Sequence, residues 1–132
     1  MSGVAIIRSI LANNGNLVSA VTSDKIIAGV APINTSLPVL TVTQISGIEY
    51  QLIKQVGVQL VSDRVQVTVL ANSYVQQKQL LELVRSAVSS TRGTINGFPV
   101  DSIVRQIDGP DLYSDDPIMY EQSIDYIVRF YR

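Results

Sequence analysis

The sequence contains no cysteine and no histidine. Without cysteine the chain can form no disulfide, no thiol nucleophile and no thiolate metal site. Without histidine it lacks the side chain that most often serves as a general base and as a transition-metal ligand. The sequence also has no G-x-S-x-G, Walker or dinucleotide-binding glycine pattern. We therefore expect neither an enzyme nor a cofactor.

Charged residues are scarce as well. They make up 16% of the chain and the net charge is −1, whereas about a quarter of a typical globular protein is charged. No basic field is present that would hold nucleic acid. A DNA- or RNA-binding module stays open as an alternative, with tyrosines stacking on bases; affinity that falls steeply with salt would support it. The weakly charged surface suits a subunit that packs against copies of itself.

Long apolar runs are missing too. None approaches the roughly 18 residues that a membrane span needs. The N-terminal stretch MSGVAIIRSILANNG is not typical of a signal peptide, because it lacks a basic start and Arg8 interrupts its apolar part. We expect a soluble protein made in the cytoplasm, without membrane contact. The length of 132 residues fits one domain, residues 1–132.

Hydrophobic periodicity predicts the elements. Strand 58–71 shows clear alternation of apolar and polar residues, and Ser73 with Gln76 is a candidate capping box for a helix. The expected helices cover residues 3–13 and 73–90, and the expected strands cover residues 25–32, 37–46, 58–71, 100–107 and 119–131. Because strands adjacent in sequence usually pair antiparallel, we predict an α+β fold: a mostly antiparallel twisted sheet of about five strands with two helices packed on one face.

The stretch DLYSDDPIMY, residues 111–120, holds most of an acidic cluster formed by Asp108, Asp111, Asp115 and Asp116. A calcium loop needs acidic ligands at a spacing that these residues do not match. The neighbouring Gly109, Pro110 and Pro117 are typical of turns. A turn between two strands is the favoured interpretation, and a divalent-ion site is the alternative.

Asp63 and Arg64 lie inside the strand 58–71. One interpretation is a pair aimed into a cleft. The other is a pair that is solvated on the open face of the sheet or bonded to a neighbouring subunit, and this one is favoured because exposed ion pairs are common and contribute little.

Several strings, taken in order, resemble those of a known family. They are AGVAPINTSLPVLTVTQISG, DRVQVTVLANSYVQQKQLLELVRSAV, INGFPV, the DLYSDD turn and the closing YEQSIDYIVRF. From about residue 26 onwards the chain resembles the tail completion proteins of long-tailed bacteriophages, also called tail terminators, which join the tail to the head. No single string is a catalytic signature, and the resemblance carries no catalytic or metal-binding residue to this chain.

The resemblance implies a structural virion protein that forms a sixfold, hexameric ring in the tail or neck. The ring would cap the tail tube, stop polymerisation of the tail-tube protein and offer its other face to the head connector or stopper protein. DNA would pass through the lumen only as cargo, and assembly would take place in the host cell cytoplasm. A related neck or tail-tube protein of a phage or phage-derived particle is one alternative. A small metal-dependent enzyme using the Asp108–Asp116 cluster is another.

A ring needs a heterologous interface, in which one patch of a subunit meets a different patch on the next copy. The segment GIEYQLIKQVG, residues 47–57, either extends a hairpin or forms a projecting loop, and it is too apolar for a plain solvated loop. We expect subunit or tube contacts at Ile48, Tyr50, Leu52 and Ile53, with Asp63 and Arg64 as second candidates. The alternative is a hairpin tip folded onto its own core.

Overall fold

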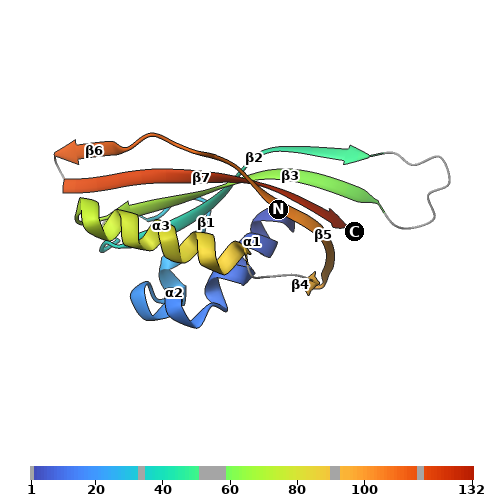
Figure 1. The fold of residues 1–132 in the computed structure, drawn as a ribbon, viewed down its shortest axis with the longest axis horizontal. Coiled ribbons are helices and arrows are strands. Elements are labelled where there is room, and N and C mark those ends of the chain that lie inside the picture. The colour runs from blue at the N-terminus through green and yellow to red at the C-terminus, as the bar shows by residue number, and fades with distance from the viewer. Residues whose placement is uncertain (1, 33–34, 51–58, 90–92, 116–117) are drawn as a thin grey trace.

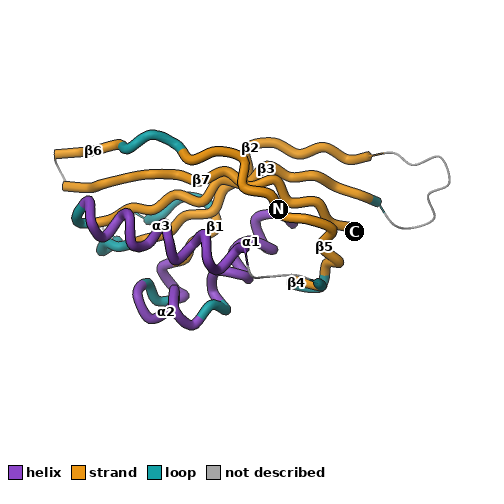
Figure 2. The backbone as a smooth tube through the Cα atoms, viewed as in Figure 1, coloured by secondary structure: helices purple, strands orange, loops and turns teal. Residues whose placement is uncertain are grey.

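The computed structural model describes residues 2–32, 35–50, 59–89, 93–115 and 118–132, and it confirms the α+β class (Figure 1). A long twisted sheet forms one layer, and the helices pack on one of its faces (Figure 2). In the described residues the elements, in chain order, are α1 (Ser2–Ala12), α2 (Gly15–Ala20), the 3-10 helix η1 (Ser23–Lys25), β1 (Ile26–Ala28), β2 (Val39–Tyr50), β3 (Leu60–Ala71), α3 (Tyr74–Ser89), β4 (Thr94–Ile95), β5 (Phe98–Asp108), β6 (Leu112–Asp115) and β7 (Ile118–Tyr131).

The sheet runs in the order β1-β2-β3-β7-β5-β4, and β6 also pairs with β7. β7 is the central strand, with β3 along one edge and β5 and β6 following one another along the other. Every pairing is antiparallel except that of β1 with β2, where Ile26–Ala28 run parallel to Leu40–Val42. The sheet is therefore mixed and larger than the five strands predicted from the sequence.

Two strands account for most of that difference. β4 has only two residues, which is too short for any periodic signal. β6 lies in the segment that the sequence assigned to a turn, and its residues pair with the start of β7 from Leu112 opposite Glu121 to Asp115 opposite Ile118. The predicted turn was thus too long, since Gly109, Pro110 and Asp111 alone separate β5 from β6.

The core lies between the sheet and the helices. Alternation along β3 sends its odd-numbered residues towards the helices. α3 covers them with an apolar stripe at helical spacing, and α1 adds a second apolar stripe. The buried residues of these three elements include Val61, Val65, Val67 and Val69 from β3, Leu80, Leu81, Val84, Ala87 and Val88 from α3, and Ile6, Ile7 and Leu11 from α1.

The sequence analysis expected one helix before the first strand, and the structure has two α-helices there. α1 ends at Ala12, close to the predicted end. Asn14 then begins α2, because its side chain accepts a hydrogen bond of 3.0 Å from the N–H of Leu17. Leu17 is fully buried. The NNGN segment is therefore both the end of one helix and the start of another.

The start of α3 follows the capping prediction in part. The N–H of Gln76 donates to the Ser73 hydroxyl at 3.2 Å, as in a capping box. The Gln76 side chain accepts from the N–H of Asn72 at 2.8 Å rather than from that of Ser73. Among the described residues no helix is both long and apolar enough to cross a membrane.

Candidate functional site

The hairpin of β2 and β3 extends past the helices at one end of the sheet (Figure 1). β2 is buried from Val39 to Val42 and exposed from Gln44 to Tyr50. Ile48 is 58% exposed and Tyr50 is 37% exposed. Neither side chain is folded into the core, so both are accessible for the contacts expected of them. Leu52 and Ile53 lie outside the described residues.

A bulge sets which face of the hairpin carries each residue. Gln44 pairs with Val65 and Ser46 with Arg64, so Ile45 is the extra residue of β2. Beyond it Ile48 pairs with Ser62 and shares the sheet face that points away from the helices. Regular alternation would place Ile45 on the same face as Val39 and Thr41, and the bulge breaks that pattern.

The sheet has two strand edges without a described backbone partner. β1 pairs with β2 only through Leu40–Val42, so the outer edge of β2 is unpaired over Ser46–Tyr50 within the described part of the chain. β4 pairs with β5 only at Phe98 and Pro99, which leaves the edge of β5 from Asp101 to Asp108 without a strand neighbour among the residues described. Val104 and Ile107 on this strand are both more than half exposed.

Asp63 is buried and binds within its own chain. Its side chain is on the helix face of β3, and its Oδ2 accepts a hydrogen bond of 3.0 Å from the N–H of Gly3 in the first turn of α1. A carboxylate at a helix N-terminus satisfies a free N–H and interacts favourably with the helix dipole. Asp63 therefore fixes the start of α1 to the sheet.

Arg64 points to the opposite face, so Asp63 and Arg64 do not form one pair aimed into a cleft. Its Nε and Nη2 donate to Oδ2 of Asp125 in β7 at 3.1 and 2.8 Å. The Gln66 side chain donates to the other oxygen of Asp125 at 3.2 Å. These bonds join β3 to β7 across the face that the helices leave open.

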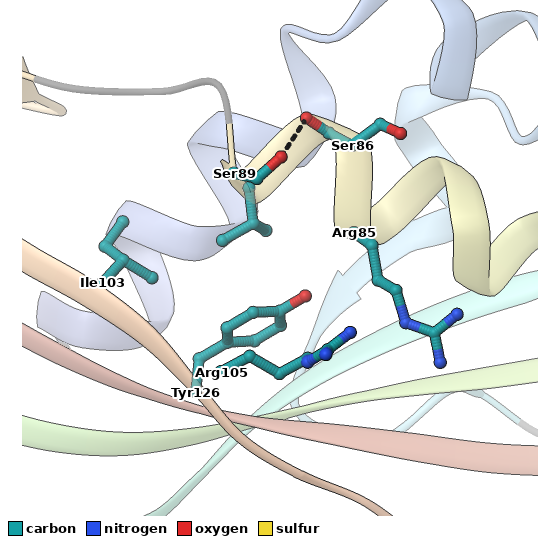
Figure 3. Close-up of a pocket in the computed structure, with 7 residues that line it drawn as sticks. Arg85, Ser86, Ser89, Ile103, Arg105 and Tyr126 are labelled. Atoms are coloured by element: carbon teal, nitrogen blue, oxygen red, sulfur yellow. Dashed lines mark hydrogen bonds between the residues drawn. The ribbon is translucent and has the colours of Figure 1, made fainter.

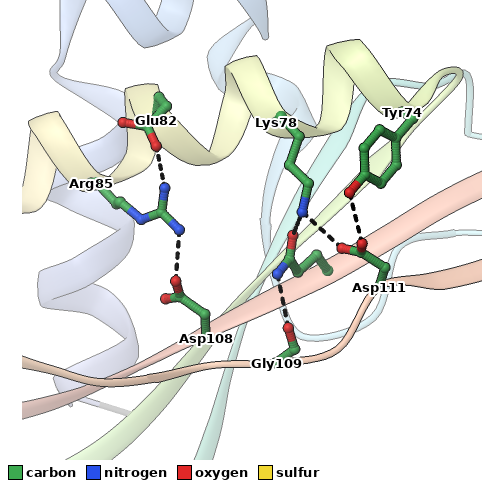
Figure 4. Close-up of polar contacts among 8 residues, drawn as sticks. Tyr74, Lys78, Glu82, Arg85, Asp108, Gly109 and Asp111 are labelled. Atoms are coloured by element: carbon green, nitrogen blue, oxygen red, sulfur yellow. Dashed lines mark hydrogen bonds and ion pairs between the residues drawn. The ribbon is translucent and has the colours of Figure 1, made fainter.

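The acidic cluster pairs with α3 (Figure 4). Asp111 accepts hydrogen bonds from the Tyr74 hydroxyl at 2.9 Å and from Lys78 Nζ at 2.8 Å. Lys78 also donates to the Gln122 side chain at 2.6 Å, and Gln122 donates to the carbonyl oxygen of Gly109 at 2.8 Å. The Lys78 and Tyr74 bonds lower the pKa of the Asp111 carboxyl, and the bond to Asp111 raises the pKa of Lys78.

Asp108 has a separate partner, Arg85, about two helical turns beyond Lys78 in α3. Arg85 Nη2 donates to its Oδ2 at 2.7 Å, and Arg85 Nη1 pairs with Glu82. Burial alone would lower the pKa of Arg85, but the bonds to Asp108 and Glu82 outweigh burial and raise the pKa. Asp115 is in β6, and Asp116 lies outside the described residues.

These contacts give the acidic cluster a structural role. Within the residues that the structure describes, no three acidic side chains are grouped so that they could hold a metal ion. The acids instead attach the β5–β6 segment to α3. Sequence reasoning missed their partners Tyr74, Lys78 and Arg85, although a signal was present: their spacing of four and seven residues puts them on one polar face of the helix.

The chain matches no protein-family model and no curated protein. Its fold is similar to that of a chain in the solved structure of the virion of a native gene transfer agent (GTA) particle. The two chains superpose with a TM-score of 0.72 over 98% of this chain and 94% of that chain, at 10% sequence identity. At this identity the likeness shows a shared fold.

Proposed function

We propose that this protein is a structural component of a phage or phage-derived virion and forms a sixfold ring at the head-proximal end of the tail. The ring ends polymerisation of the tail tube, joins the tube to the head connector and lets DNA pass through its lumen. The whole chain acts as one domain, without a cofactor or catalytic activity. Its partners are further copies of itself, the tail-tube protein and the connector.

The observation that carries the proposal is the fold likeness to a chain of a GTA virion, which covers nearly all of both chains. A shared fold does not by itself assign a function, so the site residues must agree with it. One observation supports it: the carboxylates that offered an enzymatic alternative, Asp108 and Asp111, form ion pairs with Arg85 and Lys78.

The two open strand edges support ring assembly. An edge with unpaired N–H and C=O groups is a template for pairing with another chain. β2 and β5 lie towards opposite sides of the sheet, so the edge of β2 in one copy can meet the edge of β5 in the next. That contact is heterologous, and it closes a ring when the rotations sum to a full turn.

Exposed apolar residues accompany both edges. Ile48 and Tyr50 belong to β2, and Val104 and Ile107 to β5. We assign Ile48 and Tyr50 to subunit or tube contacts. Asp63 and Arg64 have partners within the subunit, so their part in the ring is to hold the hairpin in position.

The experiment is light scattering over a wide concentration range, with negative-stain imaging of the same samples. A closed sixfold ring with a central hole supports the proposal. Ile48→Asp and Val104→Asp should each prevent ring formation, because a charge would be placed in the apolar contact. Val30→Asp is the matched control, since Val30 is 88% exposed and lies outside both edges.

Three other outcomes are informative. If the free protein is monomeric, purified tail tubes become the assay, and the protein should bind one tube end and block further growth. A closed dimer that binds no tube would contradict the proposal. Long tubes built from the protein alone would identify it as a tail-tube protein instead.

A further inference from the structure

A cleft of about 410 Å³ lies between the C-terminal half of α3 and the strands β5 and β7 (Figure 3). Val88 and Ile103 give it an apolar wall. Its polar lining comprises Ser86 and Ser89 of α3 together with Arg85, Arg105 and Tyr126, and in Figure 3 the last three side chains are gathered on one side of it. Ile103 and Arg105 belong to β5, whose outer edge is assigned above to the subunit contact, while the cleft lies on the side of the strand that faces α3.

The hydroxyl of Tyr126 is buried and unpaired within the described residues. The residue is 3% exposed, and its hydroxyl has no hydrogen-bond partner in the described part of the chain. In Figure 3 the hydroxyl points from β7 into the cleft, towards α3. Burial raises the pKa of Tyr126 to about 12, so the phenol keeps its proton at neutral pH and can donate. Buried hydroxyls normally have a partner.

A second unused donor faces the same region. The two terminal nitrogens of Arg85 bind Asp108 and Glu82. Its Nε, however, is buried without a partner among the described residues. Arg105 lies beside the Tyr126 ring and forms no ion pair with any residue that the structure describes. Three groups that donate hydrogen bonds therefore surround one cavity, and the matching ligand is one that accepts them.

The charges of the residues around the cleft indicate which kind of hydrogen-bond acceptor fits it. Arg85 and Arg105 are positive, and Glu82 and Asp108, both bound to Arg85, are negative. These four charges sum to zero, so the cleft has no strong positive potential. A ligand would be held mainly by directional hydrogen bonds from the three donors. A dianionic phosphate would be repelled by the two carboxylates that Arg85 already binds. A singly charged carboxylate avoids most of that repulsion, and its alkyl portion fits against Val88 and Ile103.

We propose that this cleft binds a carboxylate, whose oxygens accept hydrogen bonds from the Tyr126 hydroxyl and Arg85 Nε while Arg105 supplies the compensating charge. The carboxylate belongs either to a small molecule or to an acidic side chain of another protein chain, and the recognition chemistry is the same. The proposal stands independently of the ring.

The test is an acetate titration at constant ionic strength, followed by NMR on protein labelled at the tyrosine Cζ and arginine Nε positions. The resonances of Tyr126 and Arg85 should shift and saturate together. Tyr126→Phe should weaken binding about tenfold or more, because it removes one hydrogen bond to a charged group. Arg105→Gln should weaken it as well. Tyr113→Phe is the matched control, since Tyr113 is exposed in β6, and it should leave binding unchanged.

Acetate shifts that do not saturate would overturn the proposal. So would equal binding by the Tyr126→Phe variant, or phosphate binding that is tighter than acetate and insensitive to that substitution. If Tyr126→Phe fails to fold, Arg105→Gln decides the question, because Arg105 is exposed and its loss should not affect folding. A parallel titration with N-acetyl-glutamate amide identifies the source: binding at least as tight as acetate indicates a protein side chain, and weaker binding indicates a free small carboxylate.

Discussion

The carboxylate of Asp63 in β3 receives a 3.0 Å hydrogen bond from the backbone N–H of Gly3, sixty residues earlier in the chain. Gly47 in β2 approaches the same carboxylate from another side: a Cβ added there would lie 2.7 Å from Asp63 Oδ1. One buried acid thus connects the first turn of α1 with the base of the projecting hairpin.

Asp63→Ala should lower the free energy of unfolding by about 1–3 kcal/mol, because it removes a helix-terminal acceptor and leaves a buried N–H unpaired. Asp63→Asn keeps an acceptor and should cost less. Urea denaturation measures both. If Asp63→Asn leaves stability unchanged but abolishes the ring, Asp63 acts at the subunit interface rather than within the chain.

Gly3→Ala should destabilise the protein by about 1–3 kcal/mol, as overpacked sites do. A Cβ at Gly3 would lie 2.6 Å from the Cβ of Asp63, which is too close for the strand to accommodate. Gly15→Ala is the matched control. Gly15 also begins a helix, but nothing lies within 4 Å of its added Cβ, so stability should be unchanged or rise by up to about 1 kcal/mol. Equal effects of the two substitutions would contradict this packing.

Gln77→Met should raise the free energy of unfolding by about 1–2 kcal/mol. Gln77 is fully buried in α3, and neither its Nε2 nor its Oε1 has a hydrogen-bond partner among the described residues. An apolar side chain of similar length removes that desolvation cost. Thermal unfolding of both proteins checks the sign. A loss of stability would show that buried water satisfies the amide, since the apolar residue would then displace it.

Asp111→Asn should destabilise the protein near neutral pH and have no effect in acid. The folded state lowers the pKa of Asp111 through Lys78 and Tyr74. Its contribution is therefore present above the ordinary aspartate pKa of about 3.9 and is lost as the pH falls through the lower folded value. Stability curves against pH for both proteins should converge at the acid end. Asp101→Asn, an exposed change on β5, is the control that should leave the free energy of unfolding at neutral pH within about 0.5 kcal/mol of that of the unaltered protein.

Tyr126 should titrate late in an alkaline ultraviolet titration, with a pKa of about 12. Because the folded state raises this pKa above the ordinary tyrosine value of about 10, the neutral phenol contributes stability that is complete below pH 10 and is lost as the pH rises towards 12. Tyr126→Phe should remove the late step. Its persistence in the variant would assign that step to another tyrosine, such as Tyr113, whose pKa is also raised by its bond to Asp115.

Much of the fold follows from periodicity in the sequence. The α+β class, the helix at α3 and the alternation along β3 were all predicted, because each repeats a local pattern over many residues. The pattern failed where local geometry departs from the ideal. The bulge at Ile45 changes which face of the sheet each later residue of β2 occupies. β4 has only two residues, which are too few to show a periodic pattern.

The candidate site was less accessible to sequence analysis. Exposure of Ile48 and Tyr50 depends on the hairpin extending past the helices, which is a matter of tertiary packing. The role of Asp63 depends on Gly3, and that of Arg64 on Asp125 in the final strand. Contacts between residues about sixty positions apart leave no periodic trace in one sequence. Tyr74, Lys78 and Arg85 of α3, by contrast, recur at helical spacing, and this pattern in the sequence indicates that they share one face of the helix.

The position of β7 has a consequence for biosynthesis. This strand follows β3, β5 and β6 in the chain, yet it lies between β3 and the other two in the sheet and pairs with all three. While the chain is emerging from the ribosome, β3 has one unfilled edge and β5 has no partner but the short β4, so the nascent sheet exposes strands that favour aggregation. Premature termination before residue 118 would leave two separate fragments of sheet rather than a smaller protein. Production of this protein should therefore depend strongly on translation reaching the end of β7, and on chaperones that shield the chain until then.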